Sequence, residues 1–142
     1  MHEFIAYASL VKRAYDQAFE ELRARFGLSQ SEADVLMFLF NNPECDTARE
    51  VGALRGLAKS VVSAALEQLG RRGYVSRRED AQDRRVLHLT VTEAAREAVK
   101  MGLAAQRDFG ERLLMGFSPA ERARLEEYFV RIRRNLCDKR KE

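Results

Sequence analysis

The chain has 142 residues, of which 46% are hydrophobic and 33% are charged, and its formal net charge at pH 7 is +3. This length and composition allow one folded domain with a hydrophobic core and exclude an intrinsically disordered chain. The small net charge does not identify a binding partner, so the distribution of charge along the chain is more informative.

The first 25 residues repeat apolar side chains at helical spacings of three and four, from Phe4 to Leu22. This pattern predicts one amphipathic helix over residues 3–25, ended by Gly27. Charged residues interrupt the segment, so it predicts neither a signal peptide nor a membrane-spanning helix. We therefore expect a cytoplasmic protein with no membrane partner.

Two capping boxes predict the starts of the next two helices. Ser29 begins "SQSE", which opens a helix that stops at "NNP" (residues 41–43), and Thr47 begins "TARE", which opens a short helix closed by Gly56. A longer helix follows in "LAKSVVSAALEQLGRRG" and ends at Gly73. A short helix, a turn with a glycine and a longer helix form a helix-turn-helix unit.

The longer helix has two faces of different chemistry. Its predicted core face comprises Ala58, Val62, Ala65, Leu66 and Leu69. Its opposite face carries Ser60, Ala64, Glu67 and Arg71. The period of 3.6 residues separates the two sets, so the second face is free to meet a partner.

A β-hairpin and two more helices are predicted to follow. "YVSRRE" and "VLHLTVT" flank the turn "DAQDRR" as two strands, with Leu87, Leu89 and Val91 alternating inward. Thr92 is expected to cap a further helix, and "SPAE" at residues 118–121 opens the last one. The predicted fold is therefore mainly α with a small β-hairpin, a winged helix-turn-helix. No internal repeat or linker divides residues 1–142, which predicts one domain.

Positive charge is concentrated around the hairpin. Residues 71–85 contain six arginines against Glu79, Asp80 and Asp83, while the rest of the chain is nearly balanced. A basic patch on a nearly neutral protein indicates a polyanionic partner.

From about Ser29 to Arg96 the chain resembles the MarR family of transcriptional regulators. The resemblance lies in "AREVGALRGLAKSVVSAALEQLGRRGYVSRRED" and "DAQDRRVLHLTVTEAAR", above all in "LGRRGYV" and the D-x-x-D-R-R hairpin. It implies a homodimer whose residues 29–96 form a winged helix-turn-helix DNA-binding lobe and whose residues 1–28 and 97–142 form the helical dimerisation domain. It also implies a recognition helix in the major groove and a wing in the minor groove.

The function that follows from the resemblance is sequence-specific binding of a pseudo-palindromic double-stranded DNA operator. We expect a repressor that leaves the operator when it binds a small-molecule effector. Two positions depart from the family pattern: Ala64 and Gln82 stand where relatives often have arginines, which lowers the positive charge of this interface.

The expected DNA contacts fall into two sets. The first set lies on the recognition helix, where small or hydrogen-bonding side chains would let the helix approach the base edges. It comprises Lys59, Ser60, Val61, Ser63 and Ala64. The wing and phosphate contacts are expected from Arg71, Arg72, Arg77, Arg78, Gln82 and Arg84. Glu67 would repel phosphate, and a pair with Arg71 four residues later is expected to neutralise it.

The alternation of strand side chains assigns different roles to the residues of the hairpin turn. By this parity Arg85 faces inward and pairs with Asp80 or Asp83 to hold the turn, while Arg84 faces outward to the minor groove. Asp80 at the start of the turn is expected to accept backbone N–H bonds. His88 is expected to point outward from its strand.

Two apolar stripes are larger than one small core requires: Phe4 to Leu22, and the stripe of Leu125, Tyr128, Phe129, Ile132 and Leu136. Burying them favours a homodimer that uses both chain ends. In the family the effector cleft lies between the dimerisation helices and the DNA-binding lobe. Its expected lining residues are Tyr7, Arg13, Tyr15 and Phe38, although helical packing explains each of them equally well.

Other functions receive less support from the residues. A winged-helix adaptor for proteins, without specific DNA binding, is an alternative that Ala64, Gln82 and Glu67 keep open. No nucleophile–base pair, phosphate loop or metal-ligand spacing is present, so we expect no enzyme, cofactor or metal site. Cys45 and Cys137 could sense oxidants, but we expect them to be structural cysteines.

Overall fold

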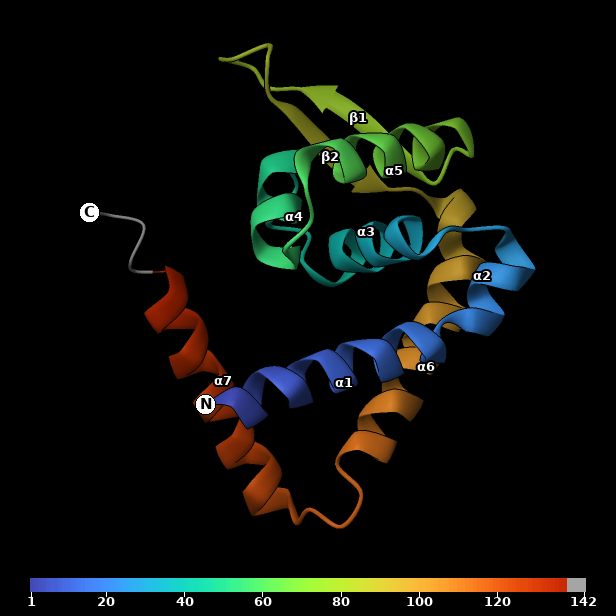
Figure 1. Cartoon of the computed structure of the whole chain (residues 1–142). Helices are drawn as coiled ribbons and strands as arrows, with labels where there is room; N and C mark the ends of the chain where they lie inside the picture. The colour runs from blue at the N-terminus through green and yellow to red at the C-terminus, as the bar shows by residue number, and fades with distance from the viewer. Residues whose placement is uncertain (138–142) are drawn as a thin grey trace. The chain divides into compact units, whose positions relative to one another are not determined.

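Residues 1–137 of the chain are described by a computed structural model, and they are mainly helical with one two-stranded hairpin, as predicted (Figure 1). The helices are α1 His2–Ala18, α2 Glu20–Phe26, α3 Gln30–Asn41, α4 Ala48–Arg55, α5 Lys59–Arg71, α6 Arg96–Leu113 and α7 Pro119–Cys137. The strands are β1 Val75–Glu79 and β2 Leu87–Val91, and a 3-10 turn, η1, covers Glu93–Ala95. The chain forms two compact units, Met1–Phe109 and a second unit that begins at Gly110.

In each of the two predicted capping boxes, both reciprocal hydrogen bonds are formed. The Ser29 hydroxyl accepts the Glu32 N–H at 3.1 Å while the Glu32 carboxylate accepts the Ser29 N–H at 3.4 Å, and Thr47 and Glu50 repeat this exchange at α4. Each cap satisfies backbone donors that the first helical turn leaves unpaired, which is why these short motifs locate the helix starts. Gly56 ends α4 with φ of 70°, a left-handed conformation that glycine adopts without strain.

The prediction of one helix over residues 3–25 was wrong. The chain breaks at Phe19, which has φ of −95° and ψ of 3°, so that α1 and α2 are separate helices. No side chain of α1 is buried, whereas Phe19 and Leu22 of the next turn are both 1% exposed. Helical periodicity continues across the break in the sequence, but the first fully buried side chain is that of Phe19, and the end of α1 contributes only the half-buried Tyr15 and Ala18 to the core.

The core of the first unit lies around α3. Half of the residues of this helix are buried, and it packs on α4, α5 and β2. The buried apolar side chains include Leu36, Met37, Val51, Val62, Leu69, Val75, Leu89 and Val99. They come from every element between α3 and α6, so the core fixes the recognition helix and the hairpin to one support.

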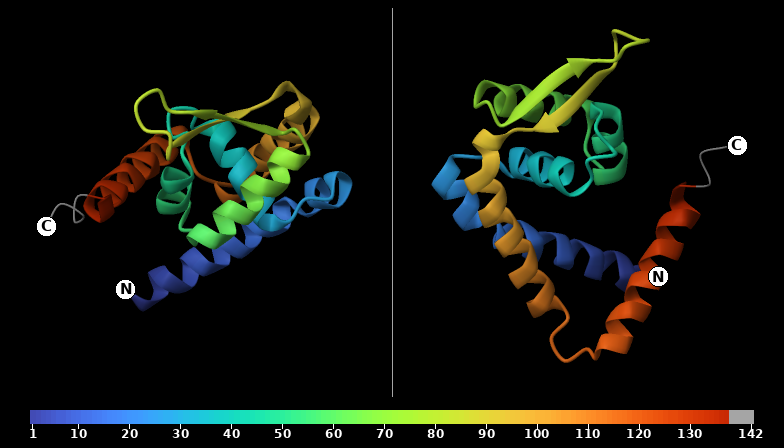
Figure 2. Two further views of the ribbon diagram at one scale, coloured as in Figure 1. Left: turned by 90° about the horizontal axis from the view of Figure 1, so that it is seen from above. Right: turned by 180° about the vertical axis from the view of Figure 1, so that it is seen from behind.

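The hairpin is antiparallel, with Val75 opposite Val91 and Glu79 opposite Leu87. The end near its turn projects beyond the neighbouring helices α4 and α5 (Figure 2). Leu89 is buried and Val91 is half-buried, as predicted, whereas Leu87 is 37% exposed: it lines the same groove as Leu89 but lies outside the buried core. The reason is that apolar alternation continues along β2 past the point where the core ends.

Thr92 does not cap a helix through its side chain, contrary to the prediction. It precedes the 3-10 turn η1 without a side-chain cap, and its hydroxyl donates instead to the carbonyl of Gly73. The backbone N–H of Thr92 donates to the carbonyl of Tyr74 at 2.9 Å. Thr92 therefore closes the base of the hairpin against the segment that follows α5.

The second unit contains the end of α6 and the helix α7. Its predicted "SPAE" box is formed, since the Ser118 N–H donates to the Glu121 carboxylate at 2.7 Å and the Glu121 N–H donates to the Ser118 hydroxyl at 3.3 Å. Arg122 donates to Glu111 across the turn before α7. The described apolar side chains of α7 include the exposed Tyr128, Phe129, Val130 and Ile132, and the side chains of Leu136 and Cys137 lie outside the described part. No helix within residues 1–137 is long and apolar enough to cross a membrane.

Candidate nucleic-acid interface

The outer face of α5 is exposed and polar, as predicted. Val62, Ala65, Leu66 and Leu69 anchor the helix in the core, and the opposite residues Lys59, Ser60, Ser63 and Ala64 are exposed. Val61 is half-buried. Ala58 was expected in the core but is exposed, because it is the residue before the first helical turn and not part of the apolar face.

The N-terminus of α5 differs from those of α3 and α4. Its N-cap residue is Ala58, which makes no side-chain hydrogen bond to the first turn, whereas the other two helices begin with complete capping boxes. The first backbone N–H groups of α5 are therefore available to an external acceptor. Together with the positive end of the helix dipole and Lys59, they favour an anionic group.

The C-terminal end of α5 carries two arginines with different tasks. Arg71 pairs with Glu67 at 2.7 Å, which confirms the expected neutralisation of that acid. The guanidinium of Arg72 donates to the carbonyl oxygens of Phe26 at 2.6 Å and of Gly27 at 2.5 Å. Arg72 therefore ties α5 to the turn after α2. The sequence does not predict this structural role, because the partners are backbone carbonyls, which every residue has, and not a recognisable side chain.

Three of the four exposed arginines of the hairpin are unpaired within residues 1–137. Among the described residues, Arg77, Arg78 and Arg84 have no hydrogen-bond or ion-pair partner. Arg77 shares a face with its cross-strand neighbour Leu89, while Arg78 shares the other face with His88. The two arginines of β1 therefore point to opposite sides of the sheet, and Arg84 lies in the turn.

The turn of the hairpin, residues 80–86, is organised by its aspartates. One carboxylate oxygen of Asp80 accepts the backbone N–H groups of Gln82 and Asp83, both at 2.9 Å, as predicted. The Asp83 carboxylate pairs with Arg85 at 3.1 Å, also as predicted, and this contact lowers the pKa of Asp83. The inward position of Arg85 was wrong, because its side chain is 91% exposed. Strand parity does not reach this residue, since β2 begins only at Leu87.

His88 is the residue that sequence reasoning misplaced most. It is half-buried, and both ring nitrogens face carboxylates: Nδ1 lies 2.9 Å from Asp46 and Nε2 lies 2.8 Å from Asp80. Hydrogen bonding first to Asp80 and then to Asp46 raises the pKa of His88. The same contact with His88 is the main cause that lowers the pKa of Asp80 to about 2. Asp46 is 42 residues away in the sequence, so no local motif announces this cluster.

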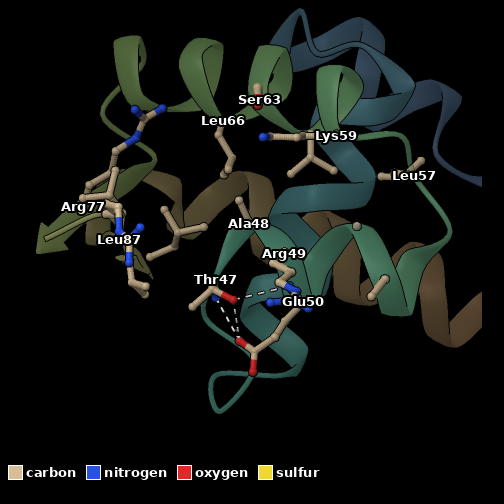
Figure 3. A pocket seen from close by; sticks show the side chains of 16 residues that line it. Thr47, Ala48, Arg49, Glu50, Leu57, Lys59, Ser63, Leu66, Arg77 and Leu87 are labelled. Atoms are coloured by element: carbon tan, nitrogen blue, oxygen red, sulfur yellow. Dashed lines mark hydrogen bonds between the residues drawn. The ribbon is translucent and has the colours of Figure 1, made fainter. Parts of the chain in front are cut away.

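A groove of about 930 Å³ lies between α4, α5 and the hairpin (Figure 3). Its apolar lining includes Leu57, Val62, Leu66, Leu87 and Leu89. Its cationic lining comprises Arg49, Lys59, Arg77 and Arg85. Ser63 of the recognition helix lines the same groove. The groove thus joins the outer face of α5 to one face of the hairpin. Arg49 and Lys59 supply charge beyond the predicted cluster at residues 71–85.

The four residues expected in an effector cleft have different environments. Tyr15 and Phe38 are half-buried against the core, whereas Tyr7 and Arg13 are exposed. The Tyr15 hydroxyl accepts a hydrogen bond from Gln106 at 2.9 Å, and the guanidinium of Arg55 lies 5.3 Å from the centre of its ring. Arg55 also pairs with Asp34 at 2.9 Å, so Tyr15 lies beside a polar cluster of α3, α4 and α6.

The remaining chemistry-bearing residues form no further site in the part of the chain that the structure describes. Within residues 1–137, no group of three or more His, Cys, Asp and Glu side chains could hold a metal ion. Cys45 is half-buried in the segment between α3 and α4. The prediction for Cys137 concerns a side chain outside the described residues.

Comparison with known proteins adds a family match and two curated relatives. Residues 26–86 match the model of the MarR family. The HTH-type transcriptional regulator YdgJ of Bacillus subtilis (strain 168) is 27% identical over 110 residues, which are 78% of this chain and 66% of that protein. The transcriptional repressor MprA of Escherichia coli (strain K12) is 31% identical over 78 residues, 55% of this chain and 44% of that protein. The chain therefore spans less than two thirds of either relative.

The fold has close structural counterparts as well. A MarR family protein from Listeria monocytogenes, solved in complex with a 26mer DNA, aligns with a TM-score of 0.83. The alignment covers 95% of this chain and 89% of that chain, at 16% sequence identity. At this identity the likeness establishes the winged-helix fold.

Proposed function

We propose that this chain is a winged-helix regulator of the MarR family, whose model matches residues 26–86, and that it binds double-stranded DNA sequence-specifically, as a homodimer on a pseudo-palindromic operator. The observation that carries the proposal is the outer face of α5. This face combines exposed short polar side chains with an uncapped N-terminus, and its Lys59 and Ser63 line the same groove as Arg77 of the hairpin, which is unpaired among the described residues.

The chemistry of α5 suits the major groove, which is wide enough to admit an α-helix. Ser60 and Ser63 are small enough to let the helix backbone approach base edges, and their hydroxyls can donate or accept hydrogen bonds. Lys59 and the free N–H groups of the first turn suit a phosphate at the same end. Ala64 adds no charge there but leaves room for close approach.

The hairpin supplies the phosphate and minor-groove contacts in this proposal. Arg77, Arg78 and Arg84 are exposed and unpaired among the described residues, so DNA binding need not break an internal ion pair to engage them. Gln82 lies exposed in the same turn. Arg71 can reach a phosphate from its exposed position, whereas Arg72 acts indirectly by holding the end of α5.

Homodimerisation is proposed from the apolar side chains that each unit leaves exposed. In α1 these are Phe4, Ile5, Tyr7, Leu10 and Val11, and in α7 they include Tyr128, Phe129, Val130 and Ile132. Exposed apolar faces of this extent indicate a protein interface. A two-fold dimer presents two copies of α5, which is the reason for expecting a pseudo-palindromic operator.

Repression and release by an effector complete the proposal. The curated relative MprA is named a repressor, which supports that direction of regulation. The groove between α4, α5 and the hairpin combines an apolar lining with four cationic side chains. An amphipathic organic anion bound there would compete with DNA phosphates for Lys59 and Arg77. The second candidate for an effector site is the environment of Tyr7, Arg13, Tyr15 and Phe38.

Two alternative functions are an enzyme and a protein–protein adaptor. Because the relatives it resembles are transcriptional regulators, we propose that the chain acts as a regulator and not as an enzyme. A protein–protein adaptor remains the alternative function, since Ala64, Gln82 and Glu67 give the surface less positive charge than a strong DNA binder has. We expect the chain to act in the cytoplasm, where it would meet its operator.

Selection of operators from random DNA tests the proposal directly. The purified chain is mixed with a library of random duplexes, and bound sequences are recovered over several rounds. We expect an inverted repeat with half-sites about 10 bp apart or a multiple of it. Affinity for it should fall steeply with salt, because phosphate contacts release counterions. Binding without sequence enrichment and without salt dependence would instead support the adaptor.

A further inference from the structure

His88 joins the hairpin turn to the rest of the lobe through two hydrogen bonds. Its Nε2 faces the carboxylate of Asp80 at the start of the turn, and its Nδ1 faces the carboxylate of Asp46 in the segment before α4. Both aspartates are held in place by other bonds. The carbonyl of Asp46 accepts the N–H of Leu89 at 2.8 Å, and Asp80 accepts two backbone N–H groups of the turn.

Only one protonation state of His88 allows its ring to donate a hydrogen bond to both carboxylates. An ionised carboxylate is only an acceptor, so each ring nitrogen that faces one has to carry a proton. A neutral imidazole has one N–H, and its second nitrogen would present a lone pair to a carboxylate. The positively charged imidazolium is therefore the form that fits between Asp46 and Asp80.

The cross-strand partner of His88 on β1 is a further charged residue, Arg78. Its side chain is exposed, and the two carboxylates outweigh it, since Asp80 and Asp46 raise the pKa of His88. The carboxyl of Asp80 has a pKa of about 2 and stays ionised at every pH at which the protein would work. Changes near neutral pH thus fall on the proton of His88.

We propose that His88 is a positioning residue for DNA binding: as an imidazolium held between Asp46 and Asp80 it fixes the hairpin turn to the lobe, and it releases the turn when it loses its proton. This inference rests on the proposed DNA-binding function. Arg84 lies in the turn that His88 fixes, four residues from Asp80. A turn held in one orientation presents Arg84 to the minor groove without the entropy cost of ordering it on binding.

The direction of the pH dependence follows from the raised pKa. The contribution of the imidazolium is complete below the ordinary histidine pKa of about 6.5 and is lost as pH rises through the higher value in the folded protein. DNA affinity should therefore be greatest in mildly acidic solution and decrease between neutral and mildly alkaline pH. Histidine is the side chain whose ordinary pKa permits such a change.

The test measures operator affinity by fluorescence anisotropy from pH 6 to 8.5 at constant ionic strength. The operator is the duplex obtained by selection from random DNA. For the wild type we expect the dissociation constant to rise by about tenfold for each unit by which DNA binding raises the pKa of His88. His88→Gln should bind more weakly than wild type at pH 6 and should lose the pH dependence. The matched control is His2→Gln, which removes the other histidine of the chain and should leave the dependence intact.

Asp80→Asn provides a sharper variant. Its amide oxygen can accept the N–H groups of Gln82 and Asp83, while its NH2 donates to Nε2 of a neutral His88 whose Nδ1–H donates to Asp46. The turn should then be held without the extra proton, so operator affinity should be independent of pH over this range. Combining Arg84→Ala with His88→Gln should cost less than the sum of the two, because both act through the same turn.

Proton NMR of the two histidines separates failure of this inference from failure of the proposed function. The inference predicts that His88 titrates above the ordinary histidine pKa of about 6.5 and that the amides of residues 80–86 become more mobile in 15N relaxation as His88 loses its proton. A chain that binds no DNA at any pH, yet shows both effects, would refute the proposed function and keep the pH-dependent hold on the turn. A wild-type pH dependence of affinity that survives in His88→Gln, or turn amides unchanged across the titration, would overturn the inference.

Discussion

The side chain of Met37 in α3 occupies the position that a Cβ on Gly102 of α6 would need. Met37 is 1% exposed and Gly102 is buried, so a Cβ at residue 102 would force the Met37 side chain to shift within the core. The two helices therefore approach closely at this point because α6 carries no side chain there. This contact fixes the segment after the hairpin against the helix at the centre of the core.

We expect Gly102→Ala to destabilise the protein by about 1–3 kcal/mol, as overpacking of a full core does. The matched control is Gly110→Ala in the same helix, where a Cβ would meet nothing within 4 Å. That change should be neutral or stabilise by up to about 1 kcal/mol, since alanine is the better helix former. Denaturant unfolding measures both. Equal effects of the two substitutions would contradict the close contact.

The neighbouring arginines Arg71 and Arg72 should separate a surface role from a structural one. Arg72→Ala removes the hydrogen bonds to the carbonyls of Phe26 and Gly27 and should lower stability by about 1–2 kcal/mol. Arg71→Ala removes an exposed pair with Glu67 and should cost less than about 1 kcal/mol. Thermal unfolding of both variants decides the matter. A larger loss for Arg71→Ala would mean that the end of α5 is held differently.

The hairpin turn should show that Arg84 and Arg85 have different tasks in DNA binding. Arg84→Ala should weaken operator binding and reduce the salt dependence by about one phosphate contact per wing, without a change in unfolding temperature. Arg85→Ala should have a small effect on stability, below about 1 kcal/mol, because its pair with Asp83 is exposed to solvent. Salt-titrated binding compares the two. Wild-type binding by Arg84→Ala at all salt concentrations would remove Arg84 from the interface.

Base preference should depend on the outer face of α5. Ser60→Ala and Ser63→Ala should each lose about 1 kcal/mol or more of discrimination at particular operator positions. Gln68→Ala, an exposed change nearer the C-terminus of the same helix, serves as the control and should keep the wild-type preference. The measurement is binding to a randomised operator library. An unchanged preference in both serine variants would show that another element reads the bases.

The oligomeric state should respond to charges placed on the exposed apolar faces. Ile5→Glu and Phe129→Glu replace side chains that are 62% and 56% exposed in the chain alone, so neither should disturb its own fold. Each should convert the expected dimer into a monomer, because a buried charge without a partner opposes association. Light scattering reads the mass, and Gln17→Glu on α1 is the control. A wild-type chain that is already monomeric would refute the proposed dimer.

The sequence by itself determined the features that depend on neighbouring residues. Ser29 and Glu32, like Thr47 and Glu50, satisfy backbone groups within one helical turn, so their spacing is enough to locate a helix start. The hairpin followed in the same way from two short β-type runs and the turn between them. The exposed polar face of α5 was predictable because helical periodicity alone decides which residues oppose the core.

Only the tertiary structure decided contacts between segments that are distant in the chain. The helix break at Phe19 and the exposure of Leu87 depend on where the core begins and ends, which periodicity does not contain. The sequence does not distinguish Arg72 from its neighbour Arg71, and only the structure shows that Arg72 donates to the carbonyls of residues 26 and 27. His88 looked like an outward strand residue until folding placed Asp46 and Asp80 on either side of its ring. In each case the deciding partner is a backbone group or a side chain whose position only the packed core sets.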